Sequence, residues 1–173
     1  FEIIGGNKLK GELVPQGAKN EALQILCAVL LTSEKVTISN IPNIRDVNKL
    51  IDLLSDLGVK VTQLSEDTYE FVADDVDLEH LHSEEYKNKG SGLRGSIMVV
   101  GPMLGRFGKG YIPQPGGDKI GRRRLDTHFI GFQKLGAKFE YIAEEQFYKV
   151  EASNLEGCYM LLDEASVTGT ANI

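Results

Sequence analysis

The sequence Leu57-Gly58-Val59-Lys60-Val61 returns 78 residues later as Leu135-Gly136-Ala137-Lys138-Phe139. In each copy, a leucine ends an apolar helical pattern, a glycine follows, and the chain then alternates as a β-strand does. Glycine is favoured at the end of a helix because it adopts the left-handed backbone region at no steric cost. The two sequences predict that the chain contains two copies of one structural unit.

The first copy has a regular order of predicted elements. Apolar residues at helical spacing predict helices over residues 17–31 and 46–57, the second capped by Asn43 or Asp46. Short β-branched or alternating runs predict strands at residues 36–38, 59–61 and 69–72. The last two of these strands are expected to form a hairpin.

The same order is predicted for the second copy. We expect helices over residues 91–106 and 123–135, and strands at residues 110–113, 137–141 and 146–150. Each unit therefore reads helix, strand, helix, strand, strand, which indicates an α/β (α+β) fold. Residues 166–173 are typical of a hydroxyl-capped third helix, so we expect the chain to be part of a longer protein.

Composition excludes several classes of protein. The chain has 173 residues, of which 42% are hydrophobic and 25% charged, and its net charge is -6, so we expect no nucleic-acid partner. No apolar run reaches the roughly 18 to 20 residues that span a bilayer, so we expect no membrane partner. The two cysteines, Cys27 and Cys158, lie in apolar runs and are expected to be core residues. Such sparse cysteine favours a reducing compartment, the cytoplasm.

One local segment departs from the acidic composition. Residues 115–128 place Gly116, Gly117 and Gly121 beside the cations Lys119 and 122–124, with a single carboxylate, Asp118, among them. Arginine forks match phosphate and carboxylate oxygens in a bidentate manner. We interpret the segment as an anion-handling loop with one proton-transfer group. The alternative is a solvated turn beside a basic helix start.

Four other segments, together with this loop, carry a resemblance to a known family. They are Gly5-Gly6-Asn7-Lys8-Leu9-Lys10-Gly11-Glu12, Gly17-Ala18-Lys19-Asn20, Leu93-Arg94-Gly95-Ser96 and Ala165-Ser166-Val167. In this order they resemble the UDP-N-acetylglucosamine enolpyruvyl transferases of bacterial peptidoglycan synthesis. The resemblance runs along almost the whole chain but covers less than half of the expected enzyme.

The resemblance implies a particular fold. Members of the family have two similar domains, each built from three βαβαββ units in an inside-out α/β barrel, with helices inside and sheets outside. Residues 1–18 then belong to the other domain of the enzyme. Residues 19–173 form two units and the start of a third within one domain.

The resemblance also implies a reaction. The enolpyruvyl group of phosphoenolpyruvate moves to the 3-hydroxyl of UDP-N-acetylglucosamine, and phosphate leaves after a tetrahedral intermediate. This reaction needs cations for the phosphate and carboxylate, a proton donor for the methylene carbon and a base for the hydroxyl. It implies no metal and no organic cofactor, and a cytoplasmic location in bacteria.

Residue roles follow from the matching motifs. By resemblance, Asp118 is the proton donor and Lys19 is a catalytic residue that also binds phosphoenolpyruvate, together with Arg94 and Arg123. The residues implied for UDP-N-acetylglucosamine are Asn20, Arg94, Arg123, Arg124, Leu125, Asp126, Thr127, His128, Ser166, Val167 and Thr168. Taken singly, Lys19 and Arg94 are equally typical of solvated surface cations, and Asn20 of a helix cap.

Two positions depart from the family pattern. Many members carry cysteine where this chain has Asp118, and a carboxyl has a reference pKa of about 3.9 against about 8.5 for a thiol. Arg124 stands where proline is common, and the sequence leaves open whether it reaches a substrate phosphate or only repels its neighbours. We therefore expect a pH dependence unlike that of cysteine-bearing members, and resistance to fosfomycin, whose epoxide alkylates the loop thiol.

Three alternatives remain from the sequence. The first is the sister enzyme that transfers enolpyruvyl to shikimate 3-phosphate. The second is a non-catalytic module that binds nucleotide sugars, because the aspartate that serves the family as general base lies later than this chain extends. The third is a purely structural α/β repeat. We expect the chain alone to be inactive.

Overall fold

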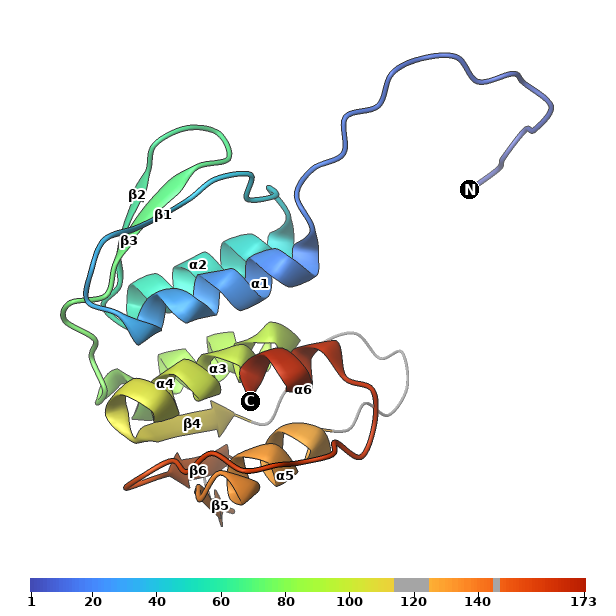
Figure 1. Ribbon diagram of the computed structural model, residues 1–173. Helices are drawn as coiled ribbons and strands as arrows, with labels where there is room; N and C mark the ends of the chain where they lie inside the picture. The colour runs from blue at the N-terminus through green and yellow to red at the C-terminus, as the bar shows by residue number, and fades with distance from the viewer. Residues whose placement is uncertain (114–124, 145–146) are drawn as a thin grey trace.

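The computed structural model describes residues 1–113, 125–144 and 147–173 (Figure 1). The first unit confirms the predicted order of elements, with short shifts at their ends. Its helices are α1 (Lys19–Ala28), which continues as the 3-10 turn η1 (Val29–Leu31), and α2 (Arg45–Asp56). Its strands are β1 (Val36–Ile38), β2 (Lys60–Gln63) and β3 (Tyr69–Val72).

The second unit repeats this order. Its helices are α4 (Val100–Phe107) and α5 (Asp126–Lys134), and its strands are β4 (Lys109–Pro113), β5 (Lys138–Ile142) and β6 (Phe147–Glu151). The two antiparallel sheets have matching strand orders, β1-β3-β2 and β4-β6-β5. The pairings also correspond, with Val61 opposite Phe71 in one sheet and Phe139 opposite Val150 in the other. The predicted repeat is therefore confirmed.

The two glycines of the repeated sequence end their helices as predicted. Gly58 has a φ of 90° and Gly136 a φ of 101°. A side chain at Gly58 would also collide with the backbone, because a Cβ there would lie 2.4 Å from the carbonyl oxygen of Asp75. The turn after α2 therefore requires glycine for both its backbone angle and its space.

The helix predicted over residues 91–106 is wrong in its first half. The chain forms α3 (Glu84–Ser91), then the 3-10 helix η3 (Arg94–Val99), and only then α4. A short 3-10 turn, η2 (His80–His82), precedes α3. The Ser83 side chain accepts a hydrogen bond of 3.0 Å from the Tyr86 backbone N–H and so caps α3. Helix α3 was missed because its sequence is almost entirely polar, and it ends where Gly90-Ser91-Gly92 disfavours helix.

The cap predicted for the second helix is also wrong. Ile44 precedes α2, and no side chain caps the helix there. Asn43 instead accepts a hydrogen bond of 2.9 Å from the side chain of Asn48, and Asp46 forms an ion pair with Lys19 of α1. Asp46 therefore links α2 to α1 and does not cap its own helix.

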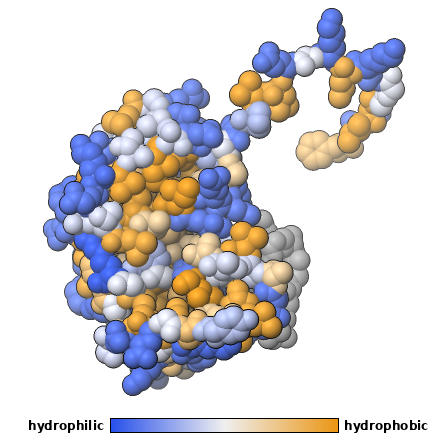
Figure 2. Space-filling view, in the orientation of Figure 1, coloured by the Kyte–Doolittle hydropathy of each residue, from blue (hydrophilic) through white to orange (hydrophobic). Residues whose placement is uncertain are grey.

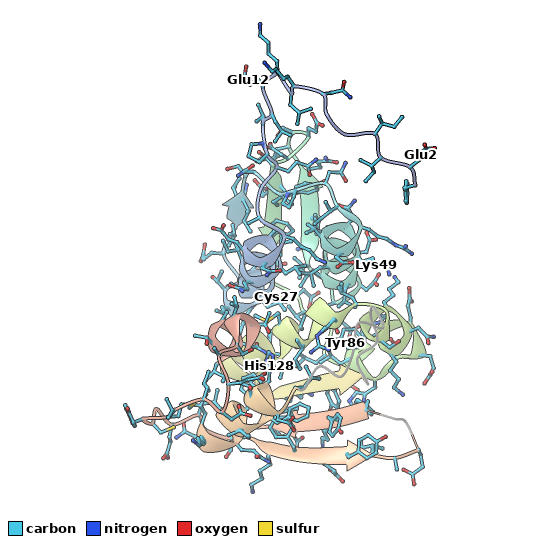
Figure 3. The ribbon with its side chains drawn as sticks, turned by 90° about the vertical axis from the view of Figure 1, so that its right-hand side faces the viewer. Glu2, Glu12, Cys27, Lys49, Tyr86 and His128 are labelled. Atoms are coloured by element: carbon cyan, nitrogen blue, oxygen red, sulfur yellow. The ribbon has the colours of Figure 1, made fainter. Side chains whose placement is uncertain are left out.

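The helices form the interior of the molecule. Figure 3 shows them between the sheet of β1–β3 above and the sheet of β4–β6 below. Leu26 and Leu30 from the first unit and Met103 and Phe132 from the second are fully or almost fully buried in one continuous core. The structure thus has mixed helices and sheets with the helices enclosed.

The two cysteines differ. Cys27 is buried in the core as predicted, and burial raises the pKa of its thiol. The prediction for Cys158 is wrong, because this residue is exposed. The chain after β6 runs as an extended segment, and its Tyr159 and Leu161 also face outward with 98% and 82% of their surface exposed.

Arg106 links the two units through backbone carbonyl groups. Nη1 of Arg106, in α4, faces three carbonyl oxygens of the first unit: Leu30 at 3.0 Å, Thr32 at 3.0 Å and Ala73 at 2.8 Å. These carbonyls follow α1 and β3, where the chain leaves regular structure. The guanidinium, which belongs to a helix of the second unit, therefore supplies hydrogen-bond donors to backbone carbonyl groups of the first unit.

The two ends of the chain differ in their contacts. The helix α6 (Val167–Asn172) packs against α5 and α4, and Ser166 caps it by accepting a hydrogen bond of 3.0 Å from the Gly169 N–H, as predicted. Residues 1–18 form neither helix nor strand and project from the body of the molecule (Figure 2). The leading strand that the resemblance implies for each unit is not among the strands of the described residues.

No helix in the described part of the chain is both long and apolar enough to cross a membrane.

Candidate functional site

A cleft of about 950 Å³ lies between helices of the two units. The first unit contributes the start of α1 and the start of α2, and the second contributes η3, α5 and the segment that leads into α6. Its lining residues are Lys19, Asn20, Leu23, Arg45, Asp46, Lys49, Gly92, Leu93, Arg94, Gly95, Ile97, Leu125, His128, Glu164, Ser166 and Thr168. The cleft thus gathers side chains that lie far apart in the sequence.

Seven of the predicted site residues line this cleft. They are Lys19, Asn20, Arg94, Leu125, His128, Ser166 and Thr168. Three others, Asp126, Thr127 and Val167, lie beside it without lining it. The predictions for Asp118, Arg123 and Arg124 fall outside the described residues.

Lys19 lies at the first position of α1 and is held by a partner across the helix pair. Its Nζ forms an ion pair with the Asp46 carboxylate, and both side chains are roughly half exposed. An ion pair this exposed contributes about 0 to 1 kcal/mol, so a bound anion can displace the carboxylate at small cost. The ammonium is therefore held in the lining of the cleft and remains accessible.

The cleft is positive in a negative chain. Lys19, Arg45, Lys49 and Arg94 line it, against two carboxylates, Asp46 and Glu164. Sequence reasoning missed Arg45 and Lys49, although their i, i+4 spacing at the start of a helix places both on one face. Figure 3 shows Lys49 on the upper helix layer and His128 on the lower one. Concentrated positive charge of this kind attracts anionic ligands.

His128 is the most enclosed polar residue of the cleft. The residue is 3% exposed, and its Nδ1 lies 3.0 Å from the side-chain nitrogen of Asn172, while its Nε2 lies 3.5 Å from the Thr168 hydroxyl. Burial, reinforced by the positive charge of Arg94, lowers the pKa of His128 to about 4. The imidazole is therefore neutral at pH 7.

This pKa predicts an acid-dependent loss of stability. Below about pH 6.5 the unfolded chain binds a proton at this imidazole, whereas the folded chain does not until about pH 4. The free energy of unfolding should therefore fall by up to about 3 kcal/mol as the pH is lowered through this window. Urea unfolding measured from pH 7 to pH 4 should give a smaller loss in His128→Gln than in the parent chain. The matched variant His82→Gln keeps His128 and should keep its acid-dependent loss; equal losses in all three chains would contradict the assignment.

Thr127 has a supporting position. It is 2% exposed, and its hydroxyl donates a hydrogen bond of 2.8 Å to the Asp163 carboxylate. This contact ties the start of α5 to the segment before α6. Thr127 thus fixes the wall that carries Glu164 and Ser166, and it does so from inside the protein.

The sequence of residues 3–173 matches the family described as EPSP synthase (3-phosphoshikimate 1-carboxyvinyltransferase). The chain belongs to the EPSP synthase family. Among curated members, the chain is 60% identical over 173 residues to UDP-N-acetylglucosamine 1-carboxyvinyltransferase of Bacteroides thetaiotaomicron and 58% identical to the protein of that name from Porphyromonas gingivalis. Each alignment covers the whole chain and 40% of the relative, so the chain spans about two fifths of the length of these proteins.

Two solved structures share the fold. The enolpyruvyl transferase NikO from Streptomyces tendae aligns with a TM-score of 0.69 at 19% identity, over 87% of this chain and 32% of its own. EPSP synthase from Acinetobacter baumannii aligns with the same TM-score at 13% identity, over 98% of this chain and 38% of its own. The expected fold is therefore confirmed at the level of the enolpyruvyl transferase fold with its mixed helices and sheets.

Proposed function

We propose that this chain supplies substrate-binding walls of an enzyme that transfers the enolpyruvyl group of phosphoenolpyruvate to the 3-hydroxyl of UDP-N-acetylglucosamine. Phosphate is released, and the reaction is the first committed step of peptidoglycan synthesis in the bacterial cytoplasm. The observation that carries the proposal is a cleft in which both repeats place cations, in a chain about 60% identical to proteins named for this activity. Both substrates are anionic, so the charge of the cleft suits them.

In this proposal, cations of the cleft bind phosphoenolpyruvate. Lys19 and Arg94 bind the phosphate and carboxylate of phosphoenolpyruvate, together with Arg123. Preorganised cations in a partly enclosed site stabilise the charge that develops on the leaving phosphate. Asp118 donates the proton to the methylene carbon.

The acceptor is assigned to the remaining walls. Asn20, Leu125 and His128 line the cleft and are proposed to contact UDP-N-acetylglucosamine, as are Ser166 and Thr168. The same role is proposed for Arg124, Asp126, Thr127 and Val167 from their place in the matching motifs, with Arg94 and Arg123 shared between the two substrates. Thr127 acts through the wall that it supports, because its hydroxyl is bonded to Asp163.

The finer architecture is also a proposal. Two units with enclosed helices fit two thirds of a barrel domain, which a third βαβαββ unit beginning at α6 would close. Residues 1–18, whose Ile3, Leu9 and Leu13 are at least 85% exposed, would then pair with the other domain of the longer protein. Their apolar side chains gain from burial there.

Two alternatives are tested by the choice of acceptor. Transfer to shikimate 3-phosphate has the family description in its favour, but the relatives at about 60% identity carry the UDP-N-acetylglucosamine name. A non-catalytic nucleotide-sugar module would keep the cleft and release no phosphate.

Phosphate release from phosphoenolpyruvate is the deciding measurement. It should be made on a protein of the relatives' full length that carries this chain, with UDP-N-acetylglucosamine or shikimate 3-phosphate as acceptor. We expect release only with the sugar nucleotide, and its loss in Arg123→Ala. Release with shikimate 3-phosphate alone would replace the proposal by the first alternative, and release with neither would favour the second. The 173-residue chain alone is expected to bind anions weakly and to show no turnover.

Replacing Asp118 with cysteine is expected to convert a fosfomycin-resistant enzyme into a sensitive one. The epoxide alkylates a thiolate, and a carboxylate at this position is a much weaker nucleophile towards it. The measurement is the drug concentration that halves phosphate release, together with the mass of the protein after treatment. Asp118→Asn, which removes the proposed proton donor and supplies no thiol, should show no drug adduct in the mass measurement. Potent inhibition of the parent enzyme with an adduct at position 118 would contradict this prediction.

A further inference from the structure

We propose that Asn172 is a positioning residue of the cleft, whose side-chain amide fixes His128 as a neutral imidazole with its proton on Nε2. The ring then offers one N–H donor to an uncharged oxygen of the ligand, a hydroxyl or a carbonyl. The identity of that ligand as a sugar nucleotide rests on the proposed function, whereas the state of the ring does not.

The orientation of the Asn172 amide follows from its other partners. The Gly101 backbone N–H donates to Oδ1 of Asn172 at 3.0 Å, so this atom is the oxygen. The nitrogen of the amide then donates to the Ile97 carbonyl oxygen at 2.9 Å, and it also lies 3.0 Å from Nδ1 of His128. An amide nitrogen donates two hydrogen bonds and accepts none. Nδ1 of His128 is therefore the acceptor, and the ring proton is on Nε2.

The site is built to hold this amide. Asn172 is 6% exposed, and Gly101 leaves the space that it occupies. A Cβ at Gly101 would lie 2.4 Å from the Asn172 carbonyl oxygen and 2.5 Å from Oδ1. Gly131 leaves a similar space for Ile173, since a Cβ there would lie 2.1 Å from Cδ1 of that residue. The end of α6 thus fits closely against both α4 and α5.

The remaining nitrogen of His128 belongs to the cleft. Nε2 lies 3.5 Å from the hydroxyl of Thr168, and both residues line the cleft. The charged groups around the same cleft are Lys19 of α1, Arg45, Asp46 and Lys49 of α2, Arg94 of η3, and Glu164 before α6. The positive charge of Arg94 disfavours protonation of the His128 ring to the imidazolium.

This arrangement gives the cleft two kinds of donor. Its lysines and arginines suit phosphate and carboxylate oxygens, because charge-assisted hydrogen bonds are strongest there. A neutral N–H suits a hydroxyl or carbonyl oxygen, which brings no charge to offset an imidazolium. His128 is therefore suited to a neutral group of the acceptor, and Asn172 keeps it in the state that does so.

The tautomer is directly measurable by nitrogen NMR with labelled histidine. In a chain that also carries His80→Gln and His82→Gln, the only imidazole is that of His128. We expect a protonated Nε2 and an unprotonated Nδ1 at pH 7. A protonated Nδ1 in this chain would overturn the proposal, and this measurement needs no change at Asn172.

Asn172→Asp tests the role of the amide with little change of shape. The carboxylate can still accept from Gly101, but it now accepts from His128 as well, so Nδ1 should become protonated and the pKa of His128 should rise by at least one, a tenfold change in proton affinity. Asn154→Asp is the matched control, because it makes the same charge change at an exposed asparagine. Equal titration of His128 in the two variants would overturn the proposal.

The consequence for the ligand is tested separately in a protein of the relatives' full length. Asn172→Asp should raise the KM for UDP-N-acetylglucosamine at least tenfold and change the KM for phosphoenolpyruvate less than twofold. An equal rise for both substrates would indicate a general structural defect and overturn the positioning role. If the sugar nucleotide is not a substrate at all, the proposed function fails while the tautomer and its dependence on Asn172 remain as measured.

Discussion

Replacing Lys19 with alanine is expected to reduce kcat/KM for phosphoenolpyruvate by about 10²- to 10³-fold in a protein of the relatives' full length that carries this chain. The ammonium at the start of α1 lines the cleft and is preorganised there by its ion pair with Asp46. In the proposed reaction, its loss removes a cation from the point at which phosphate develops charge as it leaves. Phosphate release at varied phosphoenolpyruvate concentration measures the effect.

Two variants separate this effect from a loss of stability. Lys35→Ala removes a lysine that is also paired with one carboxylate, Glu70, but lies just before β1 and outside the lining of the cleft, and it should leave kcat/KM unchanged. Asp46→Asn removes the partner of Lys19 and keeps the ammonium, so it should lose less activity than Lys19→Ala. A Lys19→Ala enzyme with activity within threefold of the parent would remove Lys19 from the proposed site.

Replacing Arg106 with methionine is expected to lower the free energy of unfolding by about 3 kcal/mol, since a hydrogen bond to a charged group contributes about 1.5 to 3 kcal/mol and unsatisfied carbonyls are costly. Methionine keeps much of the volume of the side chain and loses its donors. Nη1 of Arg106 faces the carbonyl oxygens of Leu30, Thr32 and Ala73, all within 3.0 Å. Urea unfolding of the 173-residue chain measures the change.

The size and the location of the stability loss distinguish the Arg106 contact from an ordinary surface contact. Lys60→Met, at an exposed lysine paired with Asp74, removes a cation that takes no part in the Arg106 contacts and should leave the free energy of unfolding almost unchanged. Hydrogen exchange in Arg106→Met should increase first in η1 and in the residues after β3, where the carbonyls lie. An unfolding free energy equal to that of Lys60→Met would show that water replaces the guanidinium without cost.

The fold was predictable because it repeats. Two copies of a leucine-glycine sequence fixed the ends of α2 and α5, and the strands that follow have the alternation expected of half-buried sheets. Helix α3 was not predictable from apolar spacing, because its sequence is polar and one serine cap with the buried Tyr86 defines it. A helix of this kind depends on tertiary contacts that a linear pattern does not contain.

The residues of the candidate site were likewise predictable only in part. Lys19, Arg94 and His128 were found through motifs, and the structure brings them to one cleft. Arg45 and Lys49 were missed because two cations four residues apart are typical of any solvated helix face. Only the approach of η3 and α5 makes this face of α2 a wall of the cleft.

Asn172 was beyond the reach of sequence reasoning. Nothing in its neighbours along the chain indicates that it bonds to Gly101, Ile97 and His128 at once. Its role comes from three elements that meet at one buried point. Buried polar networks of this kind are specified by packing and not by local sequence.

Because the walls of the cleft come from both repeats, a ligand that fills it acts as a crosslink. Its binding free energy adds to the cohesion of the two units, and at a concentration one hundred times its dissociation constant this linkage is worth about 2.7 kcal/mol. Saturation should therefore suppress any opening in which one repeat separates from the other, and amides far from the ligand in both units should gain protection together. Affinity in this protein is thus also a measure of how firmly the two repeats hold together.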